Sequence, residues 1–112
     1  EEVVLSNEYC FAKWDRYPVG EGHLLIIPKR HVSNYFDATQ SEVAAFWQLI
    51  NEAKQLVDRE FSPDGYNIGI NVGEAAGQTV FHLHIHLIPR YKGDIEDPSG
   101  GVRGVIPEKQ KY

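Results

Sequence analysis

The sequence predicts an α+β domain in which an antiparallel sheet of about five strands carries one long helix. Three observations support this fold class: short β-prone segments are bounded by turn residues, one segment has apolar residues every three or four positions, and histidines alternate with apolar residues near residue 84. A chain of 112 residues is long enough for one domain, residues 1–112. Its last segment, 93–112, contains several Gly and Pro residues and is expected to form a C-terminal tail.

The chain is predicted to begin with short strands that include a hairpin. Residues 3–5 and 9–14 have the composition of short strands. A turn rich in Pro and Gly, 17–22, then leads to an apolar, β-prone segment at 23–27 that Pro28 ends. We expect segments 9–14 and 23–27 to pair with each other as a hairpin.

A helix of about five turns is predicted to follow the hairpin. Thr39 and Glu42 have the spacing of a capping box, with Thr39 as N-cap. The helix is expected to end at the Ser-Pro-Asp-Gly sequence of 62–65 and to lie on one face of the sheet, and residues 66–72 are expected to form the next strand. The apolar face of this helix comprises Val43, Phe46, Ile50, Ala53, Val57 and Phe61, widened by Trp47, Leu49 and Leu56.

The last predicted strand carries three histidines. Successive side chains of a strand point to opposite faces, so His82, His84 and His86 are expected to share one face. A purely structural strand would favour Val or Thr at these positions, because an unpaired buried polar group costs about 1 to 3 kcal/mol. The histidine face is therefore predicted to do chemistry. The opposite, packing face is expected to hold Phe81, Leu83, Ile85 and Leu87.

Metal binding is an alternative use of these histidines. Residues two apart on a strand are about 6.7 Å apart and residues four apart about 13 Å, so at most two of the three could bind one zinc ion. The other ligands would have to be Cys10, His23, His31 or a carboxylate, and the sequence has no Cys-x-x-Cys pair. We predict no metal-ligand set, with zinc binding kept as the alternative.

Composition excludes several classes of partner. A net charge of −5 gives no basic surface for duplex nucleic acid, so an anionic ligand has to be held by local groups. No apolar run approaches the roughly 20 residues of a membrane span, and no leader is recognised, so no membrane association is expected. One cysteine cannot form an internal disulfide, which fits a cytoplasmic location. Since the chain starts at Glu1 without any methionine, we expect the native N-terminus to lie upstream.

The segment 71–79 before the histidines is rich in small residues. Glycine lets backbone N–H groups approach an anion closely, and a short amide or hydroxyl side chain can complete such a site without net charge. This composition suits phosphate binding in an acidic protein. The alternative is a tight hairpin loop in which the glycines serve only the backbone geometry.

Two separated motifs resemble the histidine triad (HIT) superfamily. The sequence His-Leu-His-Ile-His-Leu-Ile at 82–88 has the superfamily's alternation of histidine and apolar residues, with Gly-Gln-Thr just before it and Pro-Arg after it. Upstream, Gly-His-Leu-Leu-Ile-Ile-Pro-Lys-Arg-His-Val at 22–32 is similar to the superfamily's first-half segment, and the resemblance covers residues 8–92. It implies a HIT-like fold that dimerises into one continuous sheet.

The resemblance also implies roles for four histidines. His84 corresponds to the nucleophile that forms a nucleotidyl-histidine, and its other ring nitrogen is expected to donate to a backbone carbonyl. His86 is expected to contact the phosphoryl oxygens as charge develops. His82 is expected to orient its neighbours, and His23 to lie near the phosphate or the leaving group. Which histidine delivers the proton stays open.

Five further residues match nucleotide-binding positions of the superfamily. The resemblance implies that Phe11 packs on the base and that Asp15 hydrogen-bonds the ribose hydroxyls. It also implies that Asn71 and Thr79 contact the phosphate, whereas Gln78 contacts the bridging or leaving-group oxygen. For Asp15 an ordinary turn acid at a strand end is the alternative.

The expected function is that of a nucleotide hydrolase that cleaves a phosphoanhydride and releases a nucleoside monophosphate. Gly-Gln-Thr-Val before the triad and Pro-Arg after it resemble the dinucleoside polyphosphate hydrolases, which implies a purine nucleotide substrate with adenine favoured. His86 stands where the galactose-1-phosphate uridylyltransferase branch has glutamine. No cofactor is expected, and Mg²⁺ would enter only in complex with the substrate. Arg90, Lys92 and Arg103 are either ligands of outer groups of the substrate or solvated cations.

Three other functions are kept as alternatives. A purine nucleoside phosphoramidase would use the same site, although that branch favours Ser after the Gln and a Gly-Gly-Arg ending. A non-catalytic nucleotide- or zinc-binding module would bind without turnover. Ribonuclease-like catalysis by two histidines would need a substrate 2′-hydroxyl as nucleophile.

The first testable prediction concerns assembly. Unpaired edge strands are prone to pair with another chain, and the family forms dimers through a strand and the helix, so we expect a homodimer with an intersubunit contact from the long helix. Gel filtration with light scattering measures the mass of the particle directly. A particle of 12.7 kDa, the mass of one chain, would refute the dimer.

Overall fold

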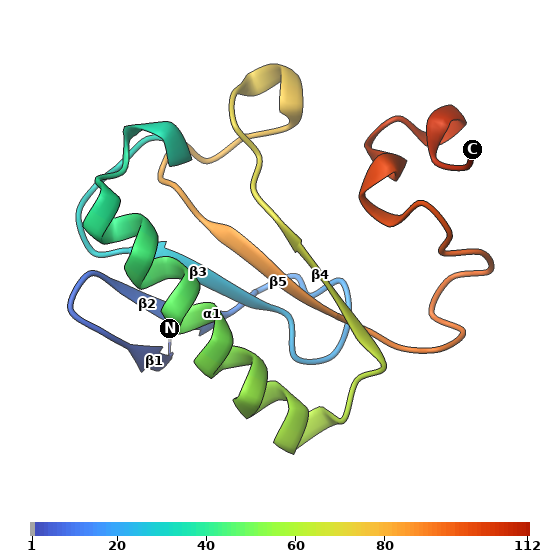
Figure 1. Cartoon of the computed structure of the whole chain (residues 1–112), viewed down its shortest axis with the longest axis horizontal. Helices are drawn as coiled ribbons and strands as arrows, with labels where there is room; N and C mark the ends of the chain where they lie inside the picture. Colours follow the sequence, from blue (N-terminus) through green and yellow to red (C-terminus); the bar gives the residue numbers. More distant parts are fainter. Residues whose placement is uncertain (1) are drawn as a thin grey trace.

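The computed structural model describes residues 2–112 and contains one five-stranded sheet with a long helix, α1 (Gln40–Phe61), in front of it (Figure 1). The strands lie in the order β1-β2-β3-β5-β4, and all neighbours are antiparallel. This architecture confirms the predicted fold class. The strands are β1 (Val3–Ser6), β2 (Cys10–Trp14), β3 (Leu24–Pro28), β4 (Gly65–Gly69) and β5 (Ile85–Arg90).

The predicted hairpin is confirmed, and it places the first half of the site. β2 and β3 pair without interruption from Cys10 opposite Pro28 to Trp14 opposite Leu24. The turn between them packs on the end of α1, where a Cβ on Gly22, whose φ is +86°, would come within 2.8 Å of Phe61. Glycine is therefore required for this turn to reach the helix.

Two strand boundaries differ from the prediction. β5 begins at Ile85 rather than at His82, because the preceding segment pairs with the loop after β3, where the Leu83 N–H donates to the Val32 carbonyl at 2.7 Å. β4 ends at Gly69, opposite His86, instead of continuing to residue 72. Residues beyond Gly69 have no strand to pair with, because β5 itself starts only one residue before His86.

The core lies between α1 and the sheet. Alternate residues of β2, β3 and β5 point towards the helix, so His86 and its alternate neighbours lie on the opposite face. Phe81 was expected in the packing face but is 48% exposed, because it precedes the segment that packs against the sheet. The buried apolar residues are Cys10, Ala12, Leu24, Ile26, Val32, Ala45, Phe46, Leu49, Ile50, Ala53, Val57, Leu83, Ile85 and Leu87.

Helix α1 begins at the predicted capping box. The Thr39 hydroxyl accepts from the Glu42 N–H at 3.1 Å, and the Glu42 carboxylate accepts from the Thr39 N–H at 2.9 Å. Both predicted ends of the helix are confirmed, and the 22 residues between them make about six turns rather than the expected five. It ends at Ser62, whose φ of +51° is left-handed. No helix within residues 2–112 is long and apolar enough to cross a membrane.

The C-terminal segment lies beyond β4, on the side away from β1 (red in Figure 1). It contains two short 3₁₀ helices, η3 (Gly101–Val105) and η4 (Pro107–Lys109). Its interactions include an ion pair between Lys111 and Asp97 at 2.9 Å and the Arg103 guanidinium 4.6 Å from the centre of the Tyr112 ring.

We expect the substitution Glu42→Ala to destabilise the fold by about 1 to 3 kcal/mol, the range for losing hydrogen bonds of a charged group. The Glu42 side chain is buried, caps the helix and accepts from Arg30 Nε at 3.0 Å and Nη2 at 2.8 Å. These bonds lower the pKa of Glu42 to about 2. Urea denaturation measures the loss, with Lys54→Ala at an exposed ion pair as control. Equal stability losses in the two variants would contradict the prediction.

Candidate functional site

One ring nitrogen of His84 is hydrogen-bonded to the backbone, and this bond determines the tautomer of the ring. Its Nδ1 lies 2.9 Å from the carbonyl oxygen of His82, and a carbonyl can only accept, so Nδ1 carries the hydrogen. This is the bond to a backbone carbonyl that the sequence predicted. In the neutral ring, Nε2 therefore presents a lone pair, which is the form that a nucleophile requires.

His23 is held in the opposite tautomer. The Val19 N–H donates to His23 Nδ1 at 3.0 Å, so the single hydrogen of the neutral ring has to sit on Nε2. The ring is only 2% exposed, and a second proton on Nδ1 would face the Val19 N–H. The turn before β3 thus keeps this histidine neutral. Sequence reasoning missed Val19, since a backbone donor leaves no signal in residue identity.

His86 receives the hydrogen of His23. His23 Nε2 lies 3.0 Å from His86 Nδ1, which is therefore the acceptor, and neutral His86 carries its own hydrogen on Nε2. The rings of His84 and His86 are neighbours, with centroids 5.2 Å apart. The site thus combines a lone pair on His84 with an N–H donor on His86, two groups of opposite character.

The carboxylate of Asp15 lies close to both His23 and His86. Its Oδ2 is 3.3 Å from His23 Nε2 and 3.9 Å from His86 Nδ1, while its Oδ1 accepts from the Tyr17 N–H at 2.7 Å. The side chain is 15% exposed. Of the two expectations for Asp15, the turn acid is confirmed by the bond to Tyr17, and the contact with a ribose stays a prediction.

The surroundings shift the proton affinity of both histidines. Burial lowers the pKa of His23 below its ordinary value, and the negative charge of Asp15 opposes that effect. Burial also lowers the pKa of His86, helped by charge repulsion from His23 and His84 and again opposed by Asp15. Both rings are therefore biased towards the neutral form at neutral pH.

Asp15, His23 and His86 are also the one group of three potential metal ligands found in residues 2–112, with ligand atoms within 4.8 Å of one another. Their hydrogen bonds argue against a metal site, because Val19 occupies His23 Nδ1 and the hydrogen on Nε2 leaves no lone pair for an ion. Cys10, a possible zinc ligand by sequence, is buried and its thiol donates to Asn7 Oδ1 at 3.3 Å.

The ring of His82 contacts Pro28 and His31, and the orienting role expected for it stays a prediction. Its Nε2 lies 3.2 Å from the Pro28 carbonyl, so Nε2 carries the hydrogen and Nδ1 can accept. His31 Nδ1 lies 3.3 Å from that acceptor, and the two rings are perpendicular. From the sequence His31 was considered only as a possible zinc ligand, with no catalytic role, although it lies in the segment 22–32 that resembles the family.

A depression of about 380 Å³ lies on the open face of the sheet beside His82 and His84. Phe11, the residue expected to pack on a base, is part of its lining. The other lining residues were not predicted to line a pocket, although the alternation along β2 and β3 places three of them on the same face as Phe11, and the fourth, Val80, precedes the triad. They are Lys13, Leu25, Ile27 and Val80.

The loop before the triad uses its glycines for backbone geometry. Gly73 and Gly77 have φ values of +90° and +92°, which residues with a side chain rarely adopt. The N–H groups of Ala76 and Gln78 donate to the Gly73 carbonyl, and that of Gly77 donates to Glu74. These three amides are thus hydrogen-bonded within the loop, and the contact of the loop's backbone N–H groups with an anion stays a prediction.

Gln78 holds this loop together. Its amide is 3% exposed, accepts from the Gly73 N–H at 2.9 Å and donates to the carbonyls of Ser33 and Val80 at 2.8 and 3.2 Å. Both polar atoms of its side chain have protein partners, so donation by Nε2 to a leaving group would require one of these bonds to break. Asn71 and Thr79 are exposed, and their contact with phosphate stays a prediction.

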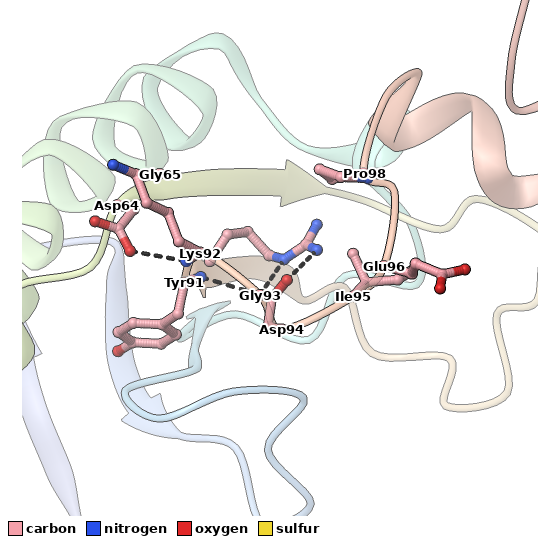
Figure 2. A pocket seen from close by; sticks show the side chains of 10 residues that line it. Asp64, Gly65, Tyr91, Lys92, Gly93, Asp94, Ile95, Glu96 and Pro98 are labelled. Carbon is pink, nitrogen blue, oxygen red and sulfur yellow. Dashed lines mark hydrogen bonds and ion pairs between the residues drawn. The ribbon is translucent and has the colours of Figure 1, made fainter.

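A second pocket, of about 340 Å³, lies where β5 passes into the C-terminal segment (Figure 2). The guanidinium of Arg90 in this pocket is already hydrogen-bonded to neighbouring side chains. It donates to Asp94 from Nε at 2.7 Å and Nη2 at 2.8 Å, and to Asn67 from Nη1 at 2.7 Å. On its other side, Asp64 accepts from the Lys92 backbone N–H. Arg90 therefore secures the end of the sheet, which argues against a role as a free phosphate ligand.

The sheet, the single helix and the alternating histidines define a histidine triad protein. The family model for the HIT domain matches residues 1–93, and the chain belongs to this family. The chain is 40% identical over 96 residues to the Bis(5'-adenosyl)-triphosphatase of Dictyostelium discoideum, an alignment covering 86% of the chain and 64% of that protein. It is 36% identical over 93 residues to the AP-4-A phosphorylase of Mycobacterium tuberculosis, covering 82% and 48%.

The fold agrees with solved HIT structures. A HIT family protein from Bacillus anthracis superposes with a TM-score of 0.78 at 39% sequence identity, covering 82% of this chain and 65% of that one. The chain thus spans less than two thirds of the length of each of these three relatives.

We expect the free energy of unfolding to fall with decreasing pH below about pH 6.5, the ordinary pKa of histidine. The pKa values of His23 and His86 are lowered in the folded state, so the unfolded chain binds their protons first as the pH falls, and above that pH both states are neutral. Urea denaturation from about pH 7.5 to about pH 5 measures the slope, which should become shallower in His23→Gln. An equal slope in both proteins would contradict this assignment.

Proposed function

We propose that the protein is a nucleotide hydrolase that cleaves a phosphoanhydride of a dinucleoside polyphosphate through a nucleotidyl-His84 intermediate. The observation that carries the proposal is the pairing of the Nε2 lone pair of His84 with an N–H donor on the neighbouring His86. A lone pair can attack phosphorus, and a donor can neutralise the charge that develops on the phosphoryl or leaving oxygen.

In the first step His84 Nε2 forms a bond to the phosphorus next to the nucleoside. The bond from that phosphorus to the leaving-group oxygen breaks, and its electron pair departs with the oxygen. The hydrogen stays on His84 Nδ1, which continues to donate to the His82 carbonyl, so the attacking ring neither gains nor loses a proton. The product is a nucleotidyl group on Nε2.

In the second step water attacks the same phosphorus. An oxygen–phosphorus bond forms, the phosphorus–Nε2 bond breaks and its electron pair returns to His84. One proton of the water is released, and a nucleoside monophosphate leaves. The cycle restores the neutral ring and needs no cofactor; Mg²⁺, where it takes part, would enter in complex with the substrate.

The nucleoside is proposed to occupy the depression beside His84. Phe11, Leu25, Ile27 and Val80 give it an apolar lining, which suits the flat face of a base. Adenine is favoured because one relative is named as a bis(5'-adenosyl)-triphosphatase and another as an AP-4-A phosphorylase.

Phosphorolysis is a second candidate, favoured by the AP-4-A phosphorylase among the relatives. The first step would be unchanged, but inorganic phosphate instead of water would attack the nucleotidyl group, and the product would be a nucleoside diphosphate. A phosphoramidase would differ in the first step alone, where a phosphorus–nitrogen bond to the leaving group would break.

We expect His84→Ala to lower the turnover of diadenosine tetraphosphate by about 10³-fold or more, because it removes the nucleophile. Wild-type protein, quenched during turnover, should carry one adenylyl group on His84 by mass spectrometry, and the variant none. Affinity for AMP, measured by calorimetry, serves as the control and should change little. High affinity for AMP without hydrolysis by the wild type would instead support a non-catalytic binding module.

The substrate class is tested by comparing kcat/KM for diadenosine tetraphosphate and for an adenosine phosphoramidate, with and without inorganic phosphate. The proposal predicts the higher value for the tetraphosphate, with AMP as product and no dependence on phosphate. A higher value for the phosphoramidate overturns the choice of substrate. ADP formed only when phosphate is present would assign phosphorolysis.

A further inference from the structure

We propose that Asp15 is a positioning residue for the proton that His86 holds during catalysis, an inference that rests on the proposed function. The carboxylate lies behind the rings of His23 and His86, with Oδ2 at 3.3 Å from His23 Nε2 and 3.9 Å from His86 Nδ1. Its negative charge favours the form of the pair that carries one additional proton.

The carboxylate is fixed by the turn that carries it. The Asp15 N–H donates to the His23 carbonyl at 2.9 Å, and Oδ1 accepts from the Tyr17 N–H at 2.7 Å. One oxygen is therefore committed to the turn, and the other is directed to the histidine pair. A residue whose backbone and side chain are each held by one hydrogen bond, and whose side chain is 15% exposed, is suited to act on a fixed neighbour.

The tautomer of His23 explains why an acceptor is needed. Its Nδ1 already accepts from Val19, so His23 cannot accept a hydrogen from His86. When His86 is protonated on both nitrogens, its Nδ1–H and the Nε2–H of His23 face each other at 3.0 Å. Asp15 Oδ2 lies 3.3 Å from His23 Nε2 and can accept its hydrogen, and the negative charge of the carboxylate, 3.9 Å from His86 Nδ1, stabilises the doubly protonated ring.

The other titratable groups around His86 do not stabilise its doubly protonated form. The titratable groups that face it are His23 from the turn before β3, His84 from the segment before β5, and Asp15 after β2. The two histidines disfavour a positive charge on His86, and the carboxylate favours it. Asp15 is thus the one of these groups that counteracts, in part, the burial of His86 and the repulsion from its neighbours.

The proton balance of the first step follows. Doubly protonated His86 gives its Nε2 proton to the departing oxygen as the phosphorus–oxygen bond breaks, and it remains neutral with its hydrogen on Nδ1. That hydrogen is on the nitrogen that lies 3.9 Å from Asp15 Oδ2, where the carboxylate charge acts on it. Donation by a positioned acid contributes about 10²- to 10⁴-fold to a rate, so the charge that maintains this proton affects kcat.

The substitution Asp15→Asn separates this role from a contact with a ribose. Asparagine retains an oxygen for the Tyr17 N–H and can still hydrogen-bond sugar hydroxyls, but it has no negative charge. Glu21→Gln is the matched control, because it removes an exposed carboxylate from the same turn. Asp15→Ser, whose hydroxyl can also cap the turn, provides a second uncharged variant if the first does not fold.

The experiment has two arms. NMR titration of the His86 ring in substrate-free protein should show its protonation midpoint at lower pH in Asp15→Asn than in wild type or Glu21→Gln. With diadenosine tetraphosphate, kcat should fall about tenfold or more and KM should change less than about threefold, with the alkaline limb of the kcat profile moved to lower pH.

The outcomes are separable. An unchanged His86 midpoint in Asp15→Asn overturns the proposal, and a raised KM with unchanged kcat would assign Asp15 to substrate binding instead. If the proposed function fails, no adenylyl-His84 forms in the wild type, yet the titration arm still measures whether Asp15 controls the proton on His86. Failure of the inference and failure of the function are therefore distinguished.

Discussion

The chemistry of the site depends on one backbone hydrogen bond, from the Val19 N–H to His23 Nδ1. It places the hydrogen of His23 on Nε2, which makes His86 Nδ1 an acceptor and leaves His86 with a donor on Nε2. On the neighbouring ring, the His82 carbonyl fixes the opposite tautomer of His84. Two backbone groups thus assign donor and acceptor roles to three imidazoles that are chemically identical in the unfolded chain.

The fold supplies these backbone groups from separate parts of the sequence. The hairpin turn has to pass close to the end of α1, which requires glycine at residue 22, and this brings His23 to the start of β3. Pairing of β3 with β5 then sets His86 opposite Leu25. Because the helix covers the other face, the histidine face stays open for a ligand.

The regular elements were predictable from the sequence, but much of the site was not. The capping box at Thr39 and the apolar stripe of α1 are local signals, so helix and sheet were predicted with small errors at their ends. Family motifs indicated His84 and His86, whereas the places of Asp15 and Gln78 depend on long-range contacts. The side-chain amide of Gln78, for example, is hydrogen-bonded to Gly73 and Ser33, and no local sequence pattern predicts the contact with Ser33.

The tautomers of His84 and His23 provide the most direct test of this account. Long-range ¹H–¹⁵N correlation spectra of the ring nitrogens identify which nitrogen carries the hydrogen in each neutral imidazole. We expect the hydrogen on Nδ1 in His84 and on Nε2 in His23. The same tautomer in both rings, or rapid averaging between the two forms, would contradict it.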